Sequence, residues 1–209
     1  DKIVIENLES VDVGVYRGVY TYRLSQLSKH VHSFEPNPLV FPYLDKNLKK
    51  VVKNMTLYNT ALSDKITEVD LRIPKRFNVI NKDNYEERYK LGASSIHKKN
   101  SLINDDYITY NIKTAKLDDL LINNNIGFIK IDVEGHEKNV VMGAINLIKK
   151  NKPNLLVEIE ERHSTDKVEH TINFINSLGY KSYYCENFKL KETKNLSNFK
   201  LINNYIFLA

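Results

Sequence analysis

The sequence is poor in cysteine and lacks any apolar run long enough to cross a membrane. Cys185 is the single cysteine among 209 residues, which excludes an internal disulfide and a metal site built from several cysteine thiolates. Because free cysteine is among the most often buried residue types, we expect Cys185 to fill the core. A lone cysteine also fits a reducing compartment, so we predict a cytoplasmic location. The missing apolar run predicts that no segment spans a membrane.

Linker-like composition and internal repeats are also absent. A chain of 209 residues is long enough to bury the core of one domain, so we predict a single domain over residues 1–209. The hydrophobic content of 42% and the charged content of 27% are typical of a soluble globular protein. The net positive charge of +5 is compatible with binding to a nucleic acid. However, the lysines are spread along the chain, and we expect no nucleic acid to bind.

A glycine turn between two short strands is the most informative feature near the start of the chain. The stretch from Val11 to Gly18 predicts a strand that ends in an acidic residue and a Gly-x-x-x-Gly turn. We expect a helix over residues 20–29 and a second strand over residues 30–34, followed by Glu35. A strand, a glycine turn, a helix and a strand that ends in an acid form the unit that binds a nucleoside-bearing cofactor at the carboxyl edge of a parallel sheet.

The residues inside this turn favour one cofactor over another. A dinucleotide site needs bare backbone against the pyrophosphate, and here the large side chains of Tyr16 and Arg17 stand in that place. S-adenosylmethionine has no phosphate and tolerates the bulkier turn, whereas a nicotinamide dehydrogenase is disfavoured. Glu35 is placed to accept hydrogen bonds from both ribose hydroxyls, because an ionised carboxylate offers two acceptor oxygens. The alternative is that Gly14 and Gly18 only permit a tight turn.

The next stretch predicts a third strand and the turn that follows it. A helical stripe over residues 38–50 leads to a strand at residues 55–60 and a turn at residues 61–64. In a doubly wound sheet this turn lies beside the adenine. The backbone groups of Ala61 and Leu62 could therefore form hydrogen bonds with the edge of the adenine base. The alternative is that these residues only end a strand.

A long polar insertion follows. Residues 69–73 and 107–112 alternate as half-buried strands do. Between them lies a polar segment, residues 75–104, which contains Gly92-Ala93-Ser94-Ser95. A polar insertion of this length predicts a lid or a substrate-facing loop.

The second informative stretch runs from Gly127 to Glu137. Residues 128–131 predict a buried parallel strand that is apolar apart from Lys130. Three polar residues then gather around the carboxyl end of this strand: Asp132, Glu134 and His136.

The remaining elements complete an α/β pattern. We expect helices over residues 117–121, 140–150 and 168–178, a strand over residues 154–159 that contains Glu158, and two closing strands over residues 180–185 and 205–208. The closing strands predict an antiparallel pair at the far edge of the sheet.

Taken together, several of these stretches resemble the FkbM family of S-adenosylmethionine-dependent methyltransferases. The resemblance is carried by Asp12-Val13-Gly14 with Gly18, Phe34 to Pro38, Ala61 to Asp64, Ser94-Ser95, Leu117 to Asp119, Ile129 to Glu137, Gly143-Ala144 and Pro153 to Glu158. The family's usual first loop is Asp-Val-Gly-Ala-Asn-x-Gly, and this sequence departs from it by placing Val15, Tyr16 and Arg17 in the middle.

The resemblance implies a fold and an activity. The fold is α/β: a Rossmann-like class I methyltransferase with a mostly parallel, doubly wound sheet, an antiparallel closing strand and a polar insertion after the third strand. Family members are similar in adding methyl groups to hydroxyls of sugars, polysaccharides or polyketides. The resemblance therefore predicts an S-adenosylmethionine-dependent O-methyltransferase that acts on a small-molecule or glycan hydroxyl.

Three groups of candidate site residues follow. The cofactor candidates are Asp12, Gly14, Tyr16, Arg17, Gly18, Thr21, Glu35, Pro36, Asn37, Ala61, Leu62 and Asp132. The acceptor candidates are Lys130, Glu158, His163 and Ser95. The catalytic candidates are Asp132, Glu134 and His136.

The catalytic candidates have different expected roles. Asp132 is the first choice for touching the reaction centre, because it ends the central strand opposite Gly14. His136 is the best general base by its intrinsic pKa, with a surface histidine at a helix start as the alternative. Glu134 is either catalytic or only a favourable charge at the helix N-terminus.

Two further expectations concern charge near this strand. Since an unpaired ammonium is costly in a buried strand, we expect Lys130 to pair with Asp12 or Glu158, or else to point at the acceptor. Asp132 and Glu134 could also hold a divalent cation such as Mg²⁺, which prefers oxygen ligands.

Two rival functions stay open. An RNA methyltransferase would draw on the basic charge, but the sequence has no Asn-Pro-Pro-Tyr-like amine site, catalytic cysteine pair or basic–aromatic binding module. A non-catalytic module that keeps the fold for docking is the other rival. The acids at positions 12, 35 and 132 argue against such a loss of function.

Overall fold

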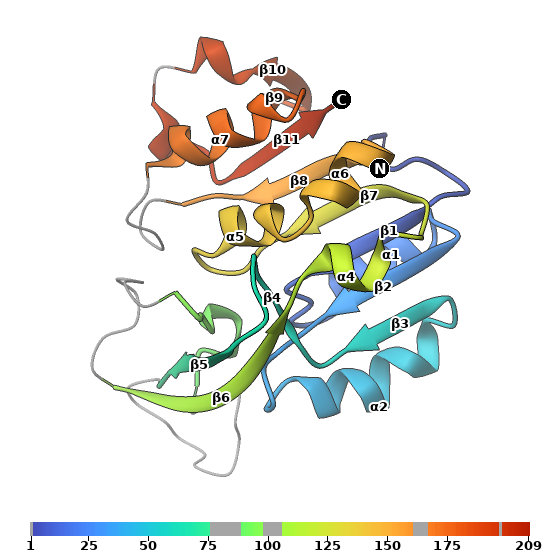
Figure 1. Ribbon diagram of the computed structural model, residues 1–209, viewed down its shortest axis with the longest axis vertical. Coiled ribbons are helices and arrows are strands. Elements are labelled where there is room, and N and C mark those ends of the chain that lie inside the picture. Colours follow the sequence, from blue (N-terminus) through green and yellow to red (C-terminus); the bar gives the residue numbers. More distant parts are fainter. Residues whose placement is uncertain (1, 76–88, 98–105, 161–166, 197) are drawn as a thin grey trace.

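A central sheet organises the molecule. The computed structural model describes residues 2–75, 89–97, 106–160, 167–196 and 198–209. Within these ranges an eight-stranded sheet has the order β10-β9-β11-β8-β7-β1-β2-β3 (Figure 1). Its strands are β1 (Glu9–Val13), β2 (His30–Phe34), β3 (Met55–Tyr58), β7 (Ile126–Ile131), β8 (Asn154–Glu158), β9 (Lys181–Glu186), β10 (Lys189–Glu192) and β11 (Asn204–Leu208). Strands β3, β2, β1, β7 and β8 are parallel, and β11 is antiparallel to both of its neighbours, so the predicted mostly parallel α/β fold is confirmed.

The two central strands explain why the polar residues meet at one edge. Strands β1 and β7 are almost wholly buried, as expected for parallel strands covered on both faces. Their register pairs Asp12 with Lys130 and Val13 with Ile131. The residues that follow each strand therefore emerge together at the carboxyl edge.

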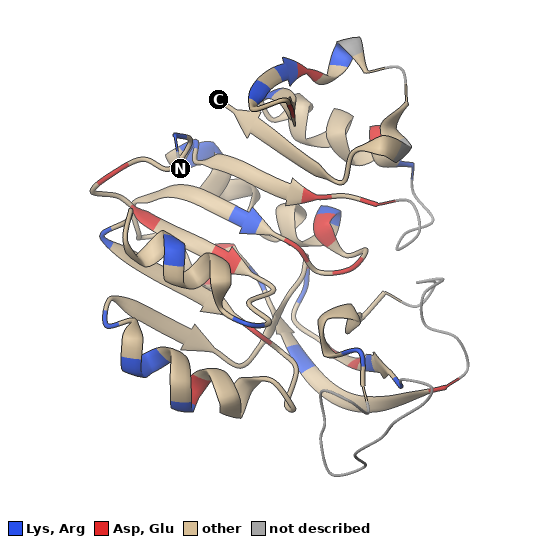
Figure 2. Ribbon diagram, turned by 180° about the vertical axis from the view of Figure 1, so that it is seen from behind, with Lys and Arg blue, Asp and Glu red and all other residues tan. Residues whose placement is uncertain are grey.

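Helices cover both faces of the sheet. Helices α1 (Val19–Ser25) and α2 (Phe41–Val51) lie on one face, and α4 (Leu117–Leu121), α5 (Glu137–Met142), α6 (Ile145–Asn151) and α7 (Val168–Ser177) lie on the other (Figures 1 and 2). The larger apolar core lies under the second set, where Val141, Leu147 and Ile175 pack against the strands. Among the described residues, no helix is both long and apolar enough to span a bilayer.

The insertion forms a small sheet of its own. Strands β4 (Ala61–Leu62), β5 (Glu68–Pro74) and β6 (Tyr107–Ala115) have the order β4-β6-β5. We predicted a turn at residues 61–64, and that prediction is wrong for Ala61 and Leu62, which pair in parallel with the end of β6. Two residues are too few to show strand alternation, and their partner is far away in the chain.

Part of the predicted lid belongs to this sheet. Residues 89–97 are joined to β5 by bridges from Lys75 to Tyr89 and from Arg72 to Ser95, and they include a 3-10 turn, η1 (Leu91–Ala93). The rest of the predicted segment, residues 76–88 and 98–104, lies outside the described residues.

The far edge of the sheet differs from the prediction in two ways. Strands β9 and β11 form the expected antiparallel pair, but the edge strand is β10, which we did not predict. A two-residue turn at Asn187 and Phe188, both with positive φ, joins β9 to β10. Cys185 is exposed rather than buried, because the inward positions of β9 are those of Ser182 and Tyr184. Two 3-10 turns, η2 (Thr193–Asn195) and η3 (Phe199–Leu201), precede β11.

The helix that we predicted over residues 140–150 is broken into α5 and α6. The carboxylate of Asp118 accepts hydrogen bonds from the backbone N–H groups of Asn146 (3.0 Å) and Leu147 (2.8 Å), which caps the start of α6. At the break, a Cβ on Gly143 would overlap the carbonyl oxygen of Ser63. The break thus lets the end of β4 approach the helices closely.

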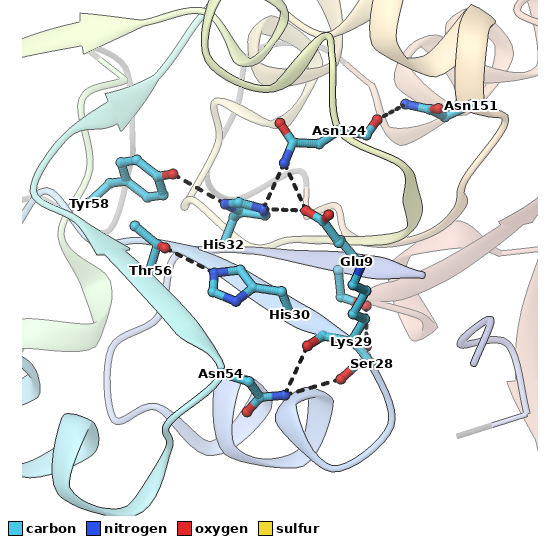
Figure 3. Close-up of polar contacts among 11 residues, drawn as sticks. Glu9, Ser28, Lys29, His30, His32, Asn54, Thr56, Tyr58, Asn124 and Asn151 are labelled. Atoms are coloured by element: carbon cyan, nitrogen blue, oxygen red, sulfur yellow. Dashed lines mark hydrogen bonds and ion pairs between the residues drawn. The ribbon is translucent and has the colours of Figure 1, made fainter. Parts of the chain in front are cut away.

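A polar cluster ties β1, β2 and β3 together away from the insertion (Figure 3). We call Glu9, His32, Tyr58 and Asn124 the Glu9 cluster. Glu9 Oε2 lies 2.7 Å from His32 Nε2 and accepts a hydrogen bond of 2.8 Å from Asn124 Nδ2. The other ring nitrogen of His32 lies 3.2 Å from the Tyr58 hydroxyl. Burial alone would raise the pKa of Glu9, but the hydrogen bonds from His32 and Asn124 outweigh it and hold the pKa below its ordinary value.

Candidate active site

A cavity of about 280 Å³ lies where β1, β2, β7 and β8 end. Its wall contains polar groups from the sheet edge and apolar side chains from the insertion. The lining residues are Val13, Gly14, Tyr16, Phe34, Glu35, Pro36, Thr60, Ala61, Leu62, Leu71, Leu91, Gly92, Ser94, Ile96, Asp132, Val133, Glu134, His136 and Glu158. Ligands of open α/β sheets bind at this edge, and mostly apolar pockets with a few polar groups are typical of such sites.

The glycine turn brings two strand ends into close contact. Gly14 has a φ of 83°, and a Cβ at this position would overlap the carbonyl oxygen of Asp132. Asp132 N–H in turn donates to the carbonyl of Val13 at 3.1 Å. Tyr16 also adopts a positive φ, 48°, which is unfavourable for a side chain of this size. A hydrogen bond from its N–H to Glu35 Oε2 (2.8 Å) holds the turn in this conformation.

Glu35 is a buried carboxylate in the cavity wall. Its Oε2 accepts the Tyr16 N–H and its Oε1 accepts the Asn37 N–H, both at 2.8 Å. Burial raises the pKa of Glu35 to about 7, and the two backbone hydrogen bonds oppose that shift without cancelling it. Each oxygen can accept a second hydrogen bond, so the carboxylate can bind two hydroxyl groups of a ligand.

Lys130 lies behind the cavity wall as a tie between strands. Its Nζ donates to Gly14 O at 2.6 Å and lies 3.3 Å from Asp12 Oδ1 and 3.4 Å from Asp132 Oδ2. Burial opposes the charge, but Asp12 and Asp132 raise the pKa of Lys130, so the ammonium stays ionised. The expected pairing with Asp12 is confirmed. The second carboxylate is Asp132, since β7 brings that residue nearer than Glu158.

An acidic rim, formed by Asp132, Glu134 and Glu158, lies at the ends of β7 and β8 and lines the cavity. Burial raises the pKa of Glu158 to about 8, and the neighbouring carboxylates of Asp132, Glu160 and Glu134 add to that shift. Glu134 precedes helix α5 in a turn with a φ of 57°, and it therefore does not occupy the first turn of that helix.

His136 has a weaker basicity than its intrinsic pKa suggested. Its Nε2 lies 2.9 Å from the Ser63 hydroxyl, which donates to Asp64 Oδ1 at 2.9 Å. Burial, followed by the charge of His97, lowers the pKa of His136 to about 4. The imidazole is therefore neutral at pH 7 and a poor proton acceptor, and its packing against Ser63 excludes the alternative of a free surface histidine.

Glu137 is a structural residue that the sequence analysis missed. Its Oε1 accepts hydrogen bonds from Gly135 N–H (2.9 Å) and Val133 N–H (3.4 Å), which holds the turn that carries the acidic rim. Burial raises the pKa of Glu137 to about 7. An acid in the first turn of a helix is the signal that could have pointed to this role.

The cavity separates the cofactor candidates into two sets. Those in the wall are Gly14, Tyr16, Glu35, Pro36, Ala61, Leu62 and Asp132. Those outside it are Asp12, Gly18, Thr21 and Asn37, which are buried, and Arg17, which is exposed. The buried residues support the wall: Thr21 Oγ1 donates to Asp12 Oδ2 at 2.6 Å, and Asn37 Nδ2 donates to the Ser94 hydroxyl at 2.8 Å.

The acceptor candidates are also divided. Glu158 lines the cavity, whereas Lys130 and Ser95 are buried outside its wall. The Ser95 hydroxyl donates to the Glu134 carbonyl at 2.7 Å, and it is the neighbouring Ser94 that reaches the cavity. His163 lies outside the described residues. The apolar wall formed by Leu71, Leu91 and Ile96 was not predicted, because it depends on how the insertion folds back.

A magnesium site is not supported. Among the residues that the structure describes, no group of three or more histidine, cysteine, aspartate or glutamate side chains could hold a metal ion. Asp132, one of the two proposed ligands, is paired with Lys130 instead. An ammonium at this distance would repel a divalent cation.

Solved structures show which fold this is. The chain is similar to the methyltransferase FkbM from Methylobacillus flagellatus KT, with a TM-score of 0.57 and 15% identity over 97% of this chain. It spans 44% of that protein. It is also similar to a putative methyltransferase from Streptococcus mutans in complex with S-adenosylhomocysteine, with a TM-score of 0.53 and 12% identity over 99% of this chain and 90% of the other. These likenesses establish a class I methyltransferase fold.

The family is established by sequence. A search of curated proteins finds no significant match. The family model described as "Methyltransferase FkbM domain" matches residues 12–182, a range that begins at the acid of β1 and includes the glycine turn, Glu35 and the acidic rim. The chain therefore belongs to the FkbM methyltransferase family.

Proposed function

We propose that this chain is an S-adenosylmethionine-dependent O-methyltransferase that acts on a hydroxyl group of a sugar, a glycan or a related natural product. The observation that carries this proposal is the cavity lined by Gly14 and Asp132, with the buried carboxylate of Glu35 in its wall. The proposal treats residues 1–209 as a single FkbM-type domain, and it places the protein in the cytoplasm on the basis of its single cysteine.

The residues of the cavity fit S-adenosylmethionine. Glu35 can accept hydrogen bonds from both hydroxyls of the ribose, since each of its oxygens has acceptor capacity left. The apolar side chains of Phe34, Leu71 and Leu91 suit the faces of an adenine. The Tyr16 side chain stands in the wall where a dinucleotide would need bare backbone. We therefore assign the wall to S-adenosylmethionine rather than to NAD.

Methyl transfer does not require the protein to form a covalent bond with the substrate. When bound, S-adenosylmethionine supplies a methyl group that its sulfonium activates for displacement. The protein must hold the acceptor oxygen about 3 Å from the methyl carbon and exclude water. We assign the positioning of the acceptor hydroxyl to Asp132, whose carboxylate is fixed by Lys130. Glu134 and the neutral His136 complete the wall beside it.

The acidic rim favours an uncharged acceptor over a polyanion. Asp132, Glu134 and Glu158 line the cavity that the acceptor would enter, and acidic side chains at this place disfavour the negative charge of a phosphate group. The basic residues are spread over the ribbon rather than gathered at this edge (Figure 2). These features favour a neutral sugar hydroxyl over RNA, the main rival.

Mass spectrometry tests the proposal. The protein would be incubated with S-adenosylmethionine and, separately, with neutral oligosaccharides, nucleotide sugars and a structured RNA. We expect a neutral saccharide to gain the mass of one methyl substitution, with a smaller yield from nucleotide sugars. The matched variants are Glu35→Gln, expected to lose activity, and Glu186→Gln on the exposed β9–β10 hairpin, expected to keep it. Methylation of the RNA alone would contradict the acceptor assignment.

A further inference from the structure

A further groove, of about 710 Å³, lies on the small sheet of the insertion, and we call it the β5–β6 groove. Most of its wall is polar. The polar side chains that line it are those of Lys65, Thr67, Glu68, Asp70, Arg72 and Asn111. Pockets of about 300–1,000 Å³ hold ligands of drug-like size. The groove is therefore large enough for a ligand with more than one ring.

The small sheet contributes to both the groove and the cavity of the candidate active site. Along the second half of β5, Asp70 is exposed, Leu71 and Ile73 are buried, and Arg72 between them is half-buried. Successive side chains of a strand point to opposite faces of the sheet. Leu71 lines the cavity, whereas Asp70 and Arg72 line the groove. One strand thus helps to close the candidate active site and presents polar groups to the groove.

Hydrogen bonds inside the protein hold the wall of the groove in place. The guanidinium of Arg72 donates to the carbonyl of His97 and lies 5.7 Å from the centre of the Tyr107 ring. The buried Thr114 hydroxyl donates to the carbonyl of Lys65 at 2.7 Å and accepts the N–H of Thr67 at 3.0 Å. Because these groups are already ordered, a ligand would lose less free energy in ordering them.

Residues 95–97 connect the groove to the acidic rim of the cavity. The hydroxyl of Ser95 donates to the carbonyl of Glu134 at 2.7 Å. The backbone N–H and carbonyl of Ser95 form two hydrogen bonds with Arg72, both of 3.0 Å. Ile96, the next residue, lines the cavity and the groove at once. An elongated acceptor held at the rim would therefore pass Ile96 and continue into the groove.

The charges of the groove favour an uncharged ligand. The cationic side chains of Lys65 and Arg72 are matched by the carboxylates of Glu68 and Asp70. Donors and acceptors of hydrogen bonds are both present, and a hydroxyl group can use both, because it donates one hydrogen and accepts at two lone pairs. A neutral chain with many hydroxyl groups fits this wall better than a polyanion does.

We propose that the β5–β6 groove binds the sugar units that lie next to the methylated unit of an oligosaccharide acceptor. The inference rests on the proposed function, because it presumes a saccharide acceptor. It goes further by selecting an oligosaccharide over a single sugar or a small natural product. Asp70, Arg72 and Asn111 are binding residues in this assignment. They lie outside the cavity, so they affect KM and not the methyl transfer itself.

The length of the acceptor tests the groove. Neutral glucose, galactose and mannose saccharides, each from the single sugar to the pentasaccharide, would be methylated with S-adenosylmethionine. We expect KM to fall with length while kcat stays constant, because the added units bind equally in the ground state and the transition state. Asp70→Ala and Asn111→Ala should raise KM for the pentasaccharide by on the order of tenfold and leave KM for the single sugar unchanged.

Thr109→Ala is the matched control for these variants. Thr109 is exposed two positions before Asn111 on β6, and it does not line the groove. It should therefore show the wild-type dependence of KM on length. A KM that does not change with length in the wild type would overturn the inference. So would Asp70→Ala and Asn111→Ala variants that keep the wild-type dependence.

Nitrogen-15 NMR gives a measurement that does not need turnover. S-adenosylhomocysteine alone should shift the backbone amide signals of Leu91 and Ile96, which line the cavity. Each pentasaccharide, added to that complex, should shift the signals of Ile96, Asp70 and Asn111. Pentasaccharides that leave the Asp70 and Asn111 signals unchanged would overturn the inference.

Calorimetry with S-adenosylhomocysteine separates the two proposals. Wild-type protein that fails to bind this ligand contradicts the proposed function. Wild-type protein that binds it, yet shows neither the dependence of KM on length nor the shifts in the groove, contradicts only the assignment of the groove.

Discussion

Glu9, which is half-buried, and Glu35, which is buried, are associated with neighbouring strands, and their pKa values move in opposite directions. Glu9 begins β1 and is held by side-chain groups of His32 and Asn124, which keep its pKa below the ordinary value despite burial. Glu35 follows β2 and has two backbone N–H partners, and burial raises its pKa to about 7. The difference lies both in the deeper burial of Glu35 and in how far hydrogen bonds compensate each negative charge.

This comparison separates a structural carboxylate from one prepared for a ligand. In the Glu9 cluster the charge is matched by hydrogen bonds within the protein (Figure 3). In the cavity wall the charge of Glu35 is only partly matched, so additional donors from a ligand can stabilise it. Perturbed pKa values in a cleft are a recognised sign of function, although ion-pair networks can produce them as well.

The largest expected effect is a loss of stability on removing Lys130, the cation behind the wall that contains Glu35. Lys130→Met would leave the wholly buried Asp12 without its cationic partner, and we expect it to lower the free energy of unfolding by about 3–5 kcal/mol. Urea unfolding measures this loss. The control Lys46→Met, on the exposed face of α2, should change stability by less than about 0.5 kcal/mol. Equal effects of the two variants would refute the role of Lys130 as a tie.

Replacing Glu35 should affect binding more than any change in the Glu9 cluster. Glu35→Gln replaces one acceptor oxygen with an amide donor, and we expect the affinity for S-adenosylhomocysteine to fall by about 1–3 kcal/mol. Isothermal titration calorimetry measures the dissociation constant. Glu9→Gln is the matched control and should bind as the wild type does. If Glu35→Gln kept the wild-type dissociation constant, Glu35 would not be the ribose acceptor.

The affinity for the cofactor should also depend on pH. The ionised form of Glu35 accepts hydrogen bonds from hydroxyl groups, and its pKa in the folded protein is about 7. Binding should therefore weaken by about tenfold between pH 8 and pH 6, because a proton must first be released. Calorimetry at several pH values measures this slope. Glu35→Gln should show no such slope, and a flat profile for the wild type would argue against ionised Glu35 as the binding form.

The smallest expected effect belongs to the Glu9 cluster. Glu9→Gln should lower the free energy of unfolding by about 1 kcal/mol at pH 7, since it removes the charge that strengthens two hydrogen bonds. The pKa of Glu9 is lower in the folded state than its ordinary value of 4.5. The ionised side chain therefore contributes its full stabilisation of the fold above about pH 4.5, and this contribution is lost as the pH falls through the pKa of the folded state. The urea midpoints of variant and wild type should therefore converge at acidic pH. A constant difference down to the lowest pH would contradict this explanation.

The sequence predicted those features that depend on neighbours in the chain. Strand β2, which lies between the glycine turn's helix and Glu35, and helix α4, with its Leu-Asp-Asp-Leu-Leu pattern, have the predicted bounds. The glycine turn was predicted from the Gly-x-x-x-Gly spacing after a strand that ends in an acid, and the structure gives Gly14 a positive φ and a close approach to the Asp132 carbonyl, both of which demand glycine.

Features that depend on distant partners were missed. The break between α5 and α6 requires Asp118 to cap α6 from another helix. Strand β4 requires the end of β6 as its partner. The lowered pKa of His136 and the raised pKa of Glu158 come from burial and from groups that the fold brings together. Intrinsic pKa values could not reveal either shift.

A crystal structure of the protein with S-adenosylhomocysteine tests the central claim most directly. We predict that the nucleoside lies in the cavity lined by Gly14 and Asp132, with both ribose hydroxyls within hydrogen-bonding distance of the Glu35 carboxylate. A ligand bound elsewhere, or a ribose turned away from Glu35, would contradict the account.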